Sequence, residues 1–317
     1  MSFSGEVKEE LAKHVSQARH CQIAELAMIL VCCAGVKKDE KNAPELQIHA
    51  ENNAVLRKCF TLLKKTFNIN TDAFETYIEQ QGKAGYYQFS LTKEQGAERV
   101  LTAVKWEKDE SGFLEHQETV SPLLIKNGCC RRAALRGAYL TIGSMSNPQR
   151  SYHLEFVCTS EKQAEQLCMI LNGFEVEAKT ILRKKYEVVY VKEGAAIVDL
   201  LNIMEAHVAL MNLENLRILK DISNTVNRRV NCEAANIAKT VNAATRQVED
   251  IELIKEKKGI SALPENLRQA ANLRLEYPEA ALSELAQMMD PQIGKSGMNH
   301  RLRKLSEIAE ELRGRKS

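Results

Sequence analysis

Nine cysteines and seven histidines are the side chains of this 317-residue chain best suited to hold a soft metal ion or to act as nucleophiles. Two cysteine pairs are adjacent in sequence, Cys32-Cys33 and Cys129-Cys130. Neither pair has the two-residue gap that lets two thiolates of one segment turn toward one zinc ion. The histidines form no HExxH motif or similar helical pair. The pattern favours small buried cysteines in helices, so the sequence predicts no metal site and no cofactor.

Phosphate chemistry is suggested by "GKSG" at 294–297, which looks like the end of a phosphate-binding loop. Such a loop needs a glycine five positions before Gly294, where this chain has Met289. No strand-like run precedes the segment either. These two departures exclude nucleotide binding at this place.

The composition is that of a soluble globular protein, with 44% hydrophobic and 27% charged residues. The longest apolar runs, such as 24–35, are too short to span a bilayer, and the charged N-terminus lacks the apolar core of a signal peptide. We therefore expect a cytoplasmic protein with reduced thiols and no membrane partner. The net charge is only +2, so any affinity for nucleic acid must come from local basic patches.

An internal repeat organises the first two-thirds of the chain. The segment from Cys21 to Leu26 aligns with the segment from Cys130 to Leu135, and each begins a strongly apolar helix. In both copies a strand, a helix, two strands and a helix follow, as judged from the apolar periodicity. The sequence predicts an N-terminal repeat over 1–110, a linker over 111–128 and a second repeat over 129–213. The fold class is α+β, with two pseudo-symmetric repeats.

Small residues in the two opening helices allow their backbones to approach closely. They are Ala24, Ala27 and Ala34 in the first helix, and Ala133, Ala134, Gly137 and Ala138 in the second. We expect these helices to pack against each other at the centre of the domain.

The same helices resemble the paired motifs of the LAGLIDADG homing endonucleases, through "LAMILVCCA" at 26–34 and "LRGAYLTIG" at 135–143. In that family the two helices form the interface, and each carries a metal-binding acid near its C-terminal end. The matching positions here hold Cys33 and Ile142. A hard Mg²⁺ ion needs oxygen ligands, which neither side chain supplies. The resemblance implies the scaffold without the nuclease activity, so we expect no catalytic residues and no enzyme.

The last third, 214–317, has the pattern of an all-α domain. A continuous helix is predicted from about Asn215 to Gly259, with apolar residues at helical spacing. Its other faces carry Asn227, Arg228, Arg229, Asn231 and Lys239. These side chains form either a solvated helix face or an additional surface for DNA or a protein partner.

A helix-turn-helix pattern follows. Leu282, Leu285, Ala286 and Met289 line a short helix, a turn covers 290–295, and Ser296 is expected to cap a second helix with its apolar face at Met298, Leu302, Leu305 and Ile308. The candidate DNA-binding residues of this helix are Lys295, Ser296, Asn299, His300, Arg301, Arg303 and Lys304. The absence of acidic residues from 295 to 304 favours phosphate contact, and Asn, His and Arg can reach base edges in the major groove. The expected partner is double-stranded DNA.

Together, the degenerate helix pair, "VNRRVNCEAANIAKTV", "LPENLRQAANLRLEYPEAALSELA" and "GKSGMNHRLRKL" resemble the WhiA family of bacterial sporulation and cell-division regulators over nearly the full chain. The resemblance implies DNA binding without cleavage, at the nucleoid, with roles in transcription, cell division and chromosome segregation. An alternative is a chromosome-associated hub whose LAGLIDADG-like domain binds a protein partner. The sequence does not separate these two functions, because one scaffold can serve either.

Overall fold

The computed structural model describes residues 2–38, 43–70, 76–80, 83–110 and 112–314. The chain divides into two compact units, Met1–Leu219 and Lys220–Ser317. Each unit has its own buried apolar core. Among the described helices, none is both long enough and apolar enough to cross a membrane.

Unit 1 begins with helix α1 (Phe3–Lys13) and then contains the same order of elements twice. The first repeat comprises α2 (Arg19–Cys33), β1 (Ala34–Lys38), β2 (Pro44–Ala50), α3 (Asn53–Phe67), β3 (Thr76–Gln80), β4 (Lys83–Leu91) and α4 (Ala97–Ala103). The second comprises α5 (Gly128–Ile142), β5 (Gly143–Met145), β6 (Leu154–Cys158), α6 (Glu161–Asn172), β7 (Lys179–Arg183), β8 (Tyr186–Val191) and α7 (Gly194–Ile203). The predicted α+β class and two-repeat, LAGLIDADG-like organisation are confirmed.

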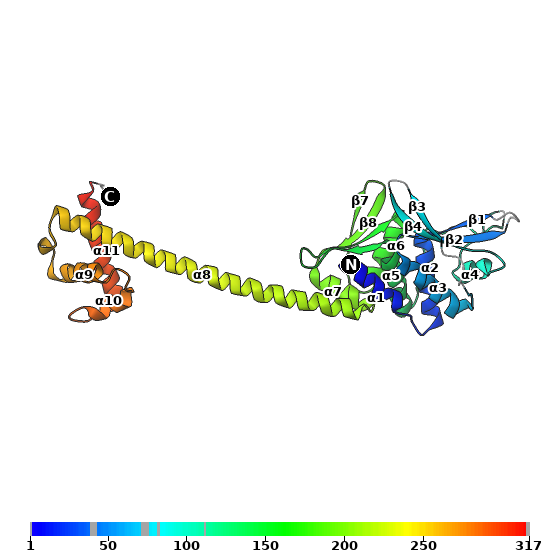
Figure 1. Ribbon diagram of the computed structural model, residues 1–317, viewed down its shortest axis with the longest axis horizontal. Coiled ribbons are helices and arrows are strands. Elements are labelled where there is room, and N and C mark those ends of the chain that lie inside the picture. Colours follow the sequence, from blue (N-terminus) through cyan, green and yellow to red (C-terminus); the bar gives the residue numbers. More distant parts are fainter. Residues whose placement is uncertain (1, 39–42, 71–75, 81–82, 111, 315–317) are drawn as a thin grey trace. The chain divides into compact units, whose positions relative to one another are not determined.

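Each repeat builds one antiparallel four-stranded sheet. The strand orders are β1-β2-β4-β3 and β5-β6-β8-β7, so equivalent strands occupy equivalent places. In Figure 1 the strands of unit 1 lie along one side, with α1, α3 and α7 on the other. Strands β1 and β5 follow directly after the two opening helices and were not predicted. The sequence also predicts a hairpin turn around Gly82, a position that lies outside the described residues.

Helices α2 and α5 pack closely against each other, as the small residues predict. Gly137 is the clearest sign of this contact, because a Cβ atom placed there would lie 2.7 Å from the backbone oxygen of Glu25. Ala24, Ala27 and Ala138 are buried in the same region. Ala34, which was expected in the first helix, instead ends it and begins β1. The chain becomes extended at that point because Ala34 pairs with Ile48 of β2.

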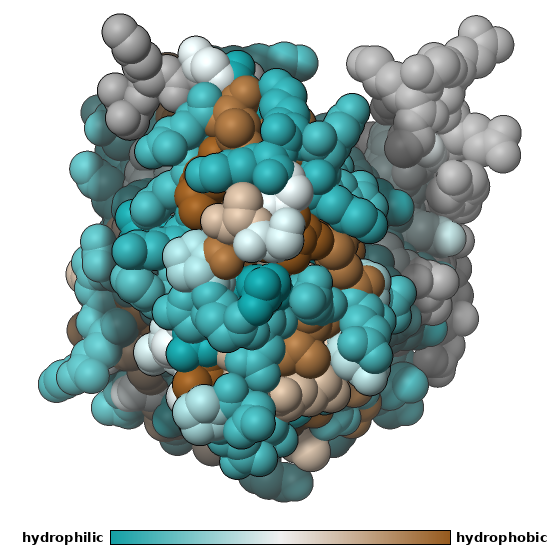
Figure 2. Space-filling view, turned by 90° about the vertical axis from the view of Figure 1, so that its left-hand side faces the viewer, coloured by the Kyte–Doolittle hydropathy of each residue, from teal (hydrophilic) through white to brown (hydrophobic). Residues whose placement is uncertain are grey.

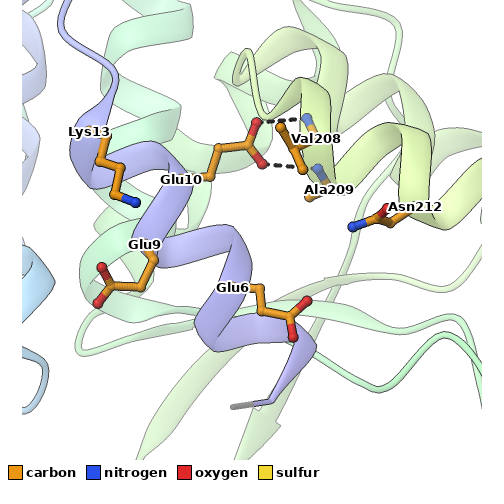
Figure 3. A pocket seen from close by; sticks show the side chains of 7 residues that line it. All are labelled: Glu6, Glu9, Glu10, Lys13, Val208, Ala209 and Asn212. Atoms are coloured by element: carbon orange, nitrogen blue, oxygen red, sulfur yellow. Dashed lines mark hydrogen bonds between the residues drawn. The ribbon is translucent and has the colours of Figure 1, made fainter.

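Side chains satisfy the free backbone groups at several helix starts. Ser160 caps α6 by accepting a hydrogen bond from the backbone N–H of Gln163 at 3.4 Å. The start of α8 (His207–Lys257) is capped from another helix. Both carboxylate oxygens of Glu10, in α1, accept backbone N–H bonds, from Val208 at 2.8 Å and from Ala209 at 2.9 Å (Figure 3). This contact fixes α1 to the end of the second repeat.

Helix α8 begins in unit 1, eight residues before the predicted start at Asn215, and continues into unit 2. Unit 2 is completed by a short 3₁₀ turn and three helices: η1 (Ile260–Ala262), α9 (Glu265–Glu276), α10 (Leu282–Met288) and α11 (Lys295–Leu312). Its core joins Ile251 and Ile254 of α8 to the apolar faces of those helices. Arg274 is buried and donates to the backbone oxygens of Tyr277, Pro278 and Ala280. It thereby holds the α9–α10 connection in place.

Candidate nucleic-acid interface

Helices α10 and α11 form the predicted helix-turn-helix. Leu285 and Ala286 of α10 and Leu302 and Leu305 of α11 are buried in one core, which fixes the inner face of each helix. Within the connection, the backbone N–H of Ile293 donates to the carbonyl oxygen of Ala286 at 3.1 Å. The core contact and this bond orient the remaining face of α11 outward.

The predicted DNA-binding residues lie near one another at the N-terminal half of α11. Six are exposed, namely Lys295, Ser296, Asn299, His300, Arg303 and Lys304, and Arg301 is half-buried. Arg303 pairs with Glu307, which lies one turn further along α11; the distance from Arg303 Nε to Glu307 Oε1 is 3.6 Å. Both side chains are exposed, so this pair holds Arg303 weakly. Figure 2 shows the end of unit 2 that faces the viewer, where hydrophilic residues cover most of the surface.

The expected cap of α11 is wrong. The residue before the helix is Gly294, which has no side chain to accept the first backbone N–H groups of α11. Ser296 lies inside the first turn, because the helix begins one residue before it, at Lys295. The first turn also lacks acidic residues. The positive end of the helix dipole and the basic side chains therefore act in the same direction, which favours an approaching phosphate.

The second group of candidates lies along α8. Asn227, Arg228, Arg229, Asn231 and Lys239 are all exposed. Arg229 Nε lies 3.0 Å from Glu233 Oε1, an exposed pair one turn apart. The group presents amides and cations to solvent, as a nucleic-acid or partner surface would.

At the places of the two nuclease acids, the structure has no oxygen ligand. Cys33 is the last residue of α2 and Ile142 the last residue of α5. The Cys33 thiol donates to the carbonyl oxygen of Ile29 at 3.1 Å, and burial raises its pKa well above the usual value. A neutral thiol and a hydrocarbon cannot hold Mg²⁺ between the helices.

A buried ion cluster near the helix pair was not predicted. Glu25 of α2 lies between Lys58 of α3 and Arg136 of α5, and all three side chains are buried. The Glu25 Oε1 to Lys58 Nζ distance is 2.8 Å, and Arg136 Nη1 also reaches Glu205 at 2.6 Å. Burial raises the pKa of Glu25 and lowers the pKa of Lys58, against their mutual attraction. The cluster joins both repeats, which gives it a structural role.

The structure also brings together His20, Cys21, Cys129 and Cys130, whose ligand atoms all lie within 4.8 Å of one another. The sequence predicts no metal site because neither cysteine pair has the ligand spacing of a zinc site within its own segment. The alignment of Cys21 with Cys130 between the two repeats is the feature of the sequence that indicates this four-residue set. It places two potential ligands at the start of each opening helix, and those helices pack together.

Comparison with known proteins gives a consistent result along the chain. Three family models match: the WhiA N-terminal LAGLIDADG-like domain over residues 19–105, the WhiA LAGLIDADG-like domain over 131–223, and the WhiA C-terminal HTH domain over 226–309.

Relatives match over nearly their whole length. A protein of Lachnoclostridium phytofermentans named probable cell division protein WhiA is 48% identical, with 99% of this chain and 100% of the relative covered. A protein of Alkaliphilus oremlandii with the same name is 48% identical, with 98% of each chain covered. The crystal structure of full-length DUF199/WhiA from Thermatoga maritima has 26% sequence identity and a TM-score of 0.57, covering 98% of this chain and 99% of that one.

Proposed function

Because the chain belongs to the WhiA family, we propose that it is a non-enzymatic regulator that binds double-stranded DNA through the helix-turn-helix of α10 and α11. Its role is in transcription linked to cell division, sporulation and chromosome segregation, at the nucleoid. The observation that supports DNA binding best is the outer face of α11. Basic and amide side chains gather there at a helix start without acidic residues.

The residues of α11 divide into two groups under this proposal. Arg303 and Asn299 contact base edges in the major groove, while Arg301 and Lys304 contact phosphates. The loss of one base contact costs about 1–3 kcal/mol, which is roughly a 5- to 150-fold loss of affinity for the preferred sequence. The loss of one phosphate contact weakens binding to all sequences alike. It also reduces the slope of log affinity against log salt concentration by about one.

Mobility-shift titrations of the full chain at several salt concentrations test this division. Arg303→Ala should reduce preference for the selected sequence, whereas Lys304→Ala should mainly flatten the salt dependence. Lys255→Ala is a matched control, since Lys255 is an exposed cation of α8 in the same unit that is not among the proposed contacts. Equal, salt-independent losses for all three variants would contradict DNA recognition by α11.

The absence of nuclease activity is part of the proposal, supported by Cys33 and Ile142 at the ends of the helix pair. Cleavage of duplex DNA needs a metal held by oxygen ligands between the reacting groups. Incubation of the DNA-bound protein with Mg²⁺ or Mn²⁺ should leave the DNA intact. Metal-dependent cutting by the purified chain would overturn this assignment.

A second candidate function is that of an interaction hub that attaches a protein partner to the chromosome. Strand β7 favours it, because β7 is at the edge of its sheet and all five of its residues are exposed, including Ile181 and Leu182. An exposed edge strand with apolar side chains is a surface on which a partner can pair. A chromatin footprint distinguishes the two candidates. Sharp sequence motifs favour the regulator, and broad coverage of the chromosome favours the hub.

A further inference from the structure

We infer that His20, Cys21, Cys129 and Cys130 bind one zinc ion that links the two repeats at the N-terminal ends of α2 and α5. Each residue offers one ligand atom, and the four atoms lie within 4.8 Å of one another. The group lies in unit 1 and is separate from the residues proposed to contact DNA. The site therefore stands independently of the proposed function.

The spacing of the donors is close to that of a tetrahedral zinc site. His20 Nδ1 lies 3.1 Å from Cys130 Sγ and 3.4 Å from Cys21 Sγ. Zn–N bonds of about 2.0–2.1 Å and Zn–S bonds of about 2.3 Å give N–S separations of about 3.6 Å and S–S separations of about 3.8 Å in a tetrahedron. Small side-chain rotations are enough to accommodate the ion. Four protein ligands complete its coordination, which is the pattern of structural rather than catalytic zinc sites.

The repeat explains how adjacent residues form this site. His20 and Cys21 are the second and third residues of α2, and Cys129 and Cys130 are the second and third residues of α5. The ligands therefore come in equivalent pairs related by the pseudo-symmetry of the repeats. Cys21 and Cys130 are buried with Ala24 and Ala133 in the seam between the helices, whereas His20 and Cys129 are exposed. The outer pair leaves a path by which zinc can enter from solvent.

The surrounding charges suit three thiolates and a neutral histidine around a divalent ion, a group with net charge −1. Neither helix has a side-chain cap or an acidic residue in its first turn, so both helix starts present positive dipole ends to this group. Arg132 and Arg136 line the same surface cavity as Cys21 and Cys129, together with His14 and one acid, Glu205. Glu205 is already paired with Arg136. Thiolate and imidazole ligands favour zinc over Mg²⁺ and Ca²⁺.

Metal analysis of the full chain tests the inference directly. Protein reconstituted with zinc in reducing buffer and then desalted should retain about one zinc per chain. Cys129→Ser and His20→Ala change exposed side chains, so these variants should fold and lose most of the metal. Cys232→Ser is the matched control, since Cys232 is an exposed cysteine of α8, and it should retain zinc. Absence of zinc from the reduced wild-type protein, or full retention by both ligand variants, would overturn the site.

Two further measurements identify the ligands. Cobalt substitution should give an intense sulfur-to-cobalt band. Measured per bound cobalt ion at saturating cobalt, its intensity should fall by about one third in Cys129→Ser and rise by about one third in His20→Cys, as the number of thiolate ligands changes. Zinc should also protect Cys129 from alkylation while the rate at Cys232 stays unchanged. Equal reactivity of Cys129 with and without zinc would contradict the inference, as would a disulfide between Cys21 and Cys130 in reductant-treated protein.

Discussion

Glu25 is the position at which the replacement of a carboxylate by an amide should have the largest effect on the stability of unit 1. Replacing Glu25 by Gln keeps the shape of the side chain and removes its charge. Lys58, which is fully buried, then loses its only carboxylate partner among the described contacts and keeps only neutral acceptors: the carbonyl oxygens of Leu11 and His14 and the amide oxygen of the new glutamine. Arg136 is less affected, because Glu205 remains 2.6 Å from its Nη1 atom.

The magnitude follows from leaving one buried cation without a counter-charge. Removal of one partner from a buried pair typically costs about 3–5 kcal/mol of unfolding free energy. Lys58→Met should cost less, because burial already raises the pKa of Glu25 and the acid can take up a proton when its partner is lost. The double variant, Glu25→Gln with Lys58→Met, should recover about 2 kcal/mol or more relative to the sum of the single changes.

Fluorescence of Trp106 reports the result for unit 1, since Trp106 is the only tryptophan and is buried in that core. Urea unfolding followed at this residue gives the free energy for each variant. The exposed pair Glu118–Lys162, with 3.5 Å between its charged atoms, is the matched control. A double-mutant cycle on the Glu118–Lys162 pair should show a coupling free energy of about 0–1 kcal/mol. If Glu25→Gln cost less than about 1 kcal/mol, or if both cycles gave equal coupling, the buried cluster would not stabilise the fold as argued.

Three other outcomes are expected. Arg274→Ala should destabilise unit 2 by about 1–3 kcal/mol, measured by hydrogen exchange in its helices, because three backbone oxygens of the α9–α10 connection lose their buried donor. Glu10→Ala should cost about 0.5–2 kcal/mol, seen as faster exchange of the Val208 and Ala209 amides, whereas Glu9→Ala on the same helix should leave them unchanged. Burial and Arg136 lower the pKa of His14 below 6.5 in the folded chain. Between the folded-state pKa and the unfolded-state pKa, the unfolded chain therefore binds more protons than the folded chain. Stability should therefore fall as the pH decreases from about 7 through the folded-state pKa, and His14→Gln should weaken that dependence in urea titrations.

The sequence by itself determined the repeat, the α+β class and the helix-turn-helix. Each of these depends on local periodicity: alternating apolar residues for strands such as β6 and β8, and three-to-four spacing for α6 and α11. The loss of the nuclease acids was equally visible, because Cys33 and Ile142 occupy fixed positions within recognisable helix motifs. Local patterns suffice where the same short-range rule applies to every residue of an element.

Helix boundaries were less well determined. Ser296 has the side chain of a good cap, yet α11 begins at Lys295 because the burial of Met298 and Leu302 sets the position of the helix. Strand β5 has only three residues, too few to show a period, and it exists because its backbone pairs with β6. In both cases a contact with a neighbouring element, rather than local propensity, decided the outcome.

Only the tertiary structure decided which polar groups meet. His20 and Cys130 are 110 positions apart, and Glu25 and Arg136 belong to different repeats. Their side chains meet because α2 and α5 pack so closely that Gly137 has no room for a Cβ atom. Spacing along one segment carries no information about such a contact. The packing of small residues along their seam fixes how the two helices cross. This crossing places the four metal ligands together at one end of the helix pair. Further along, it places the buried carboxylate of Glu25 between two cations.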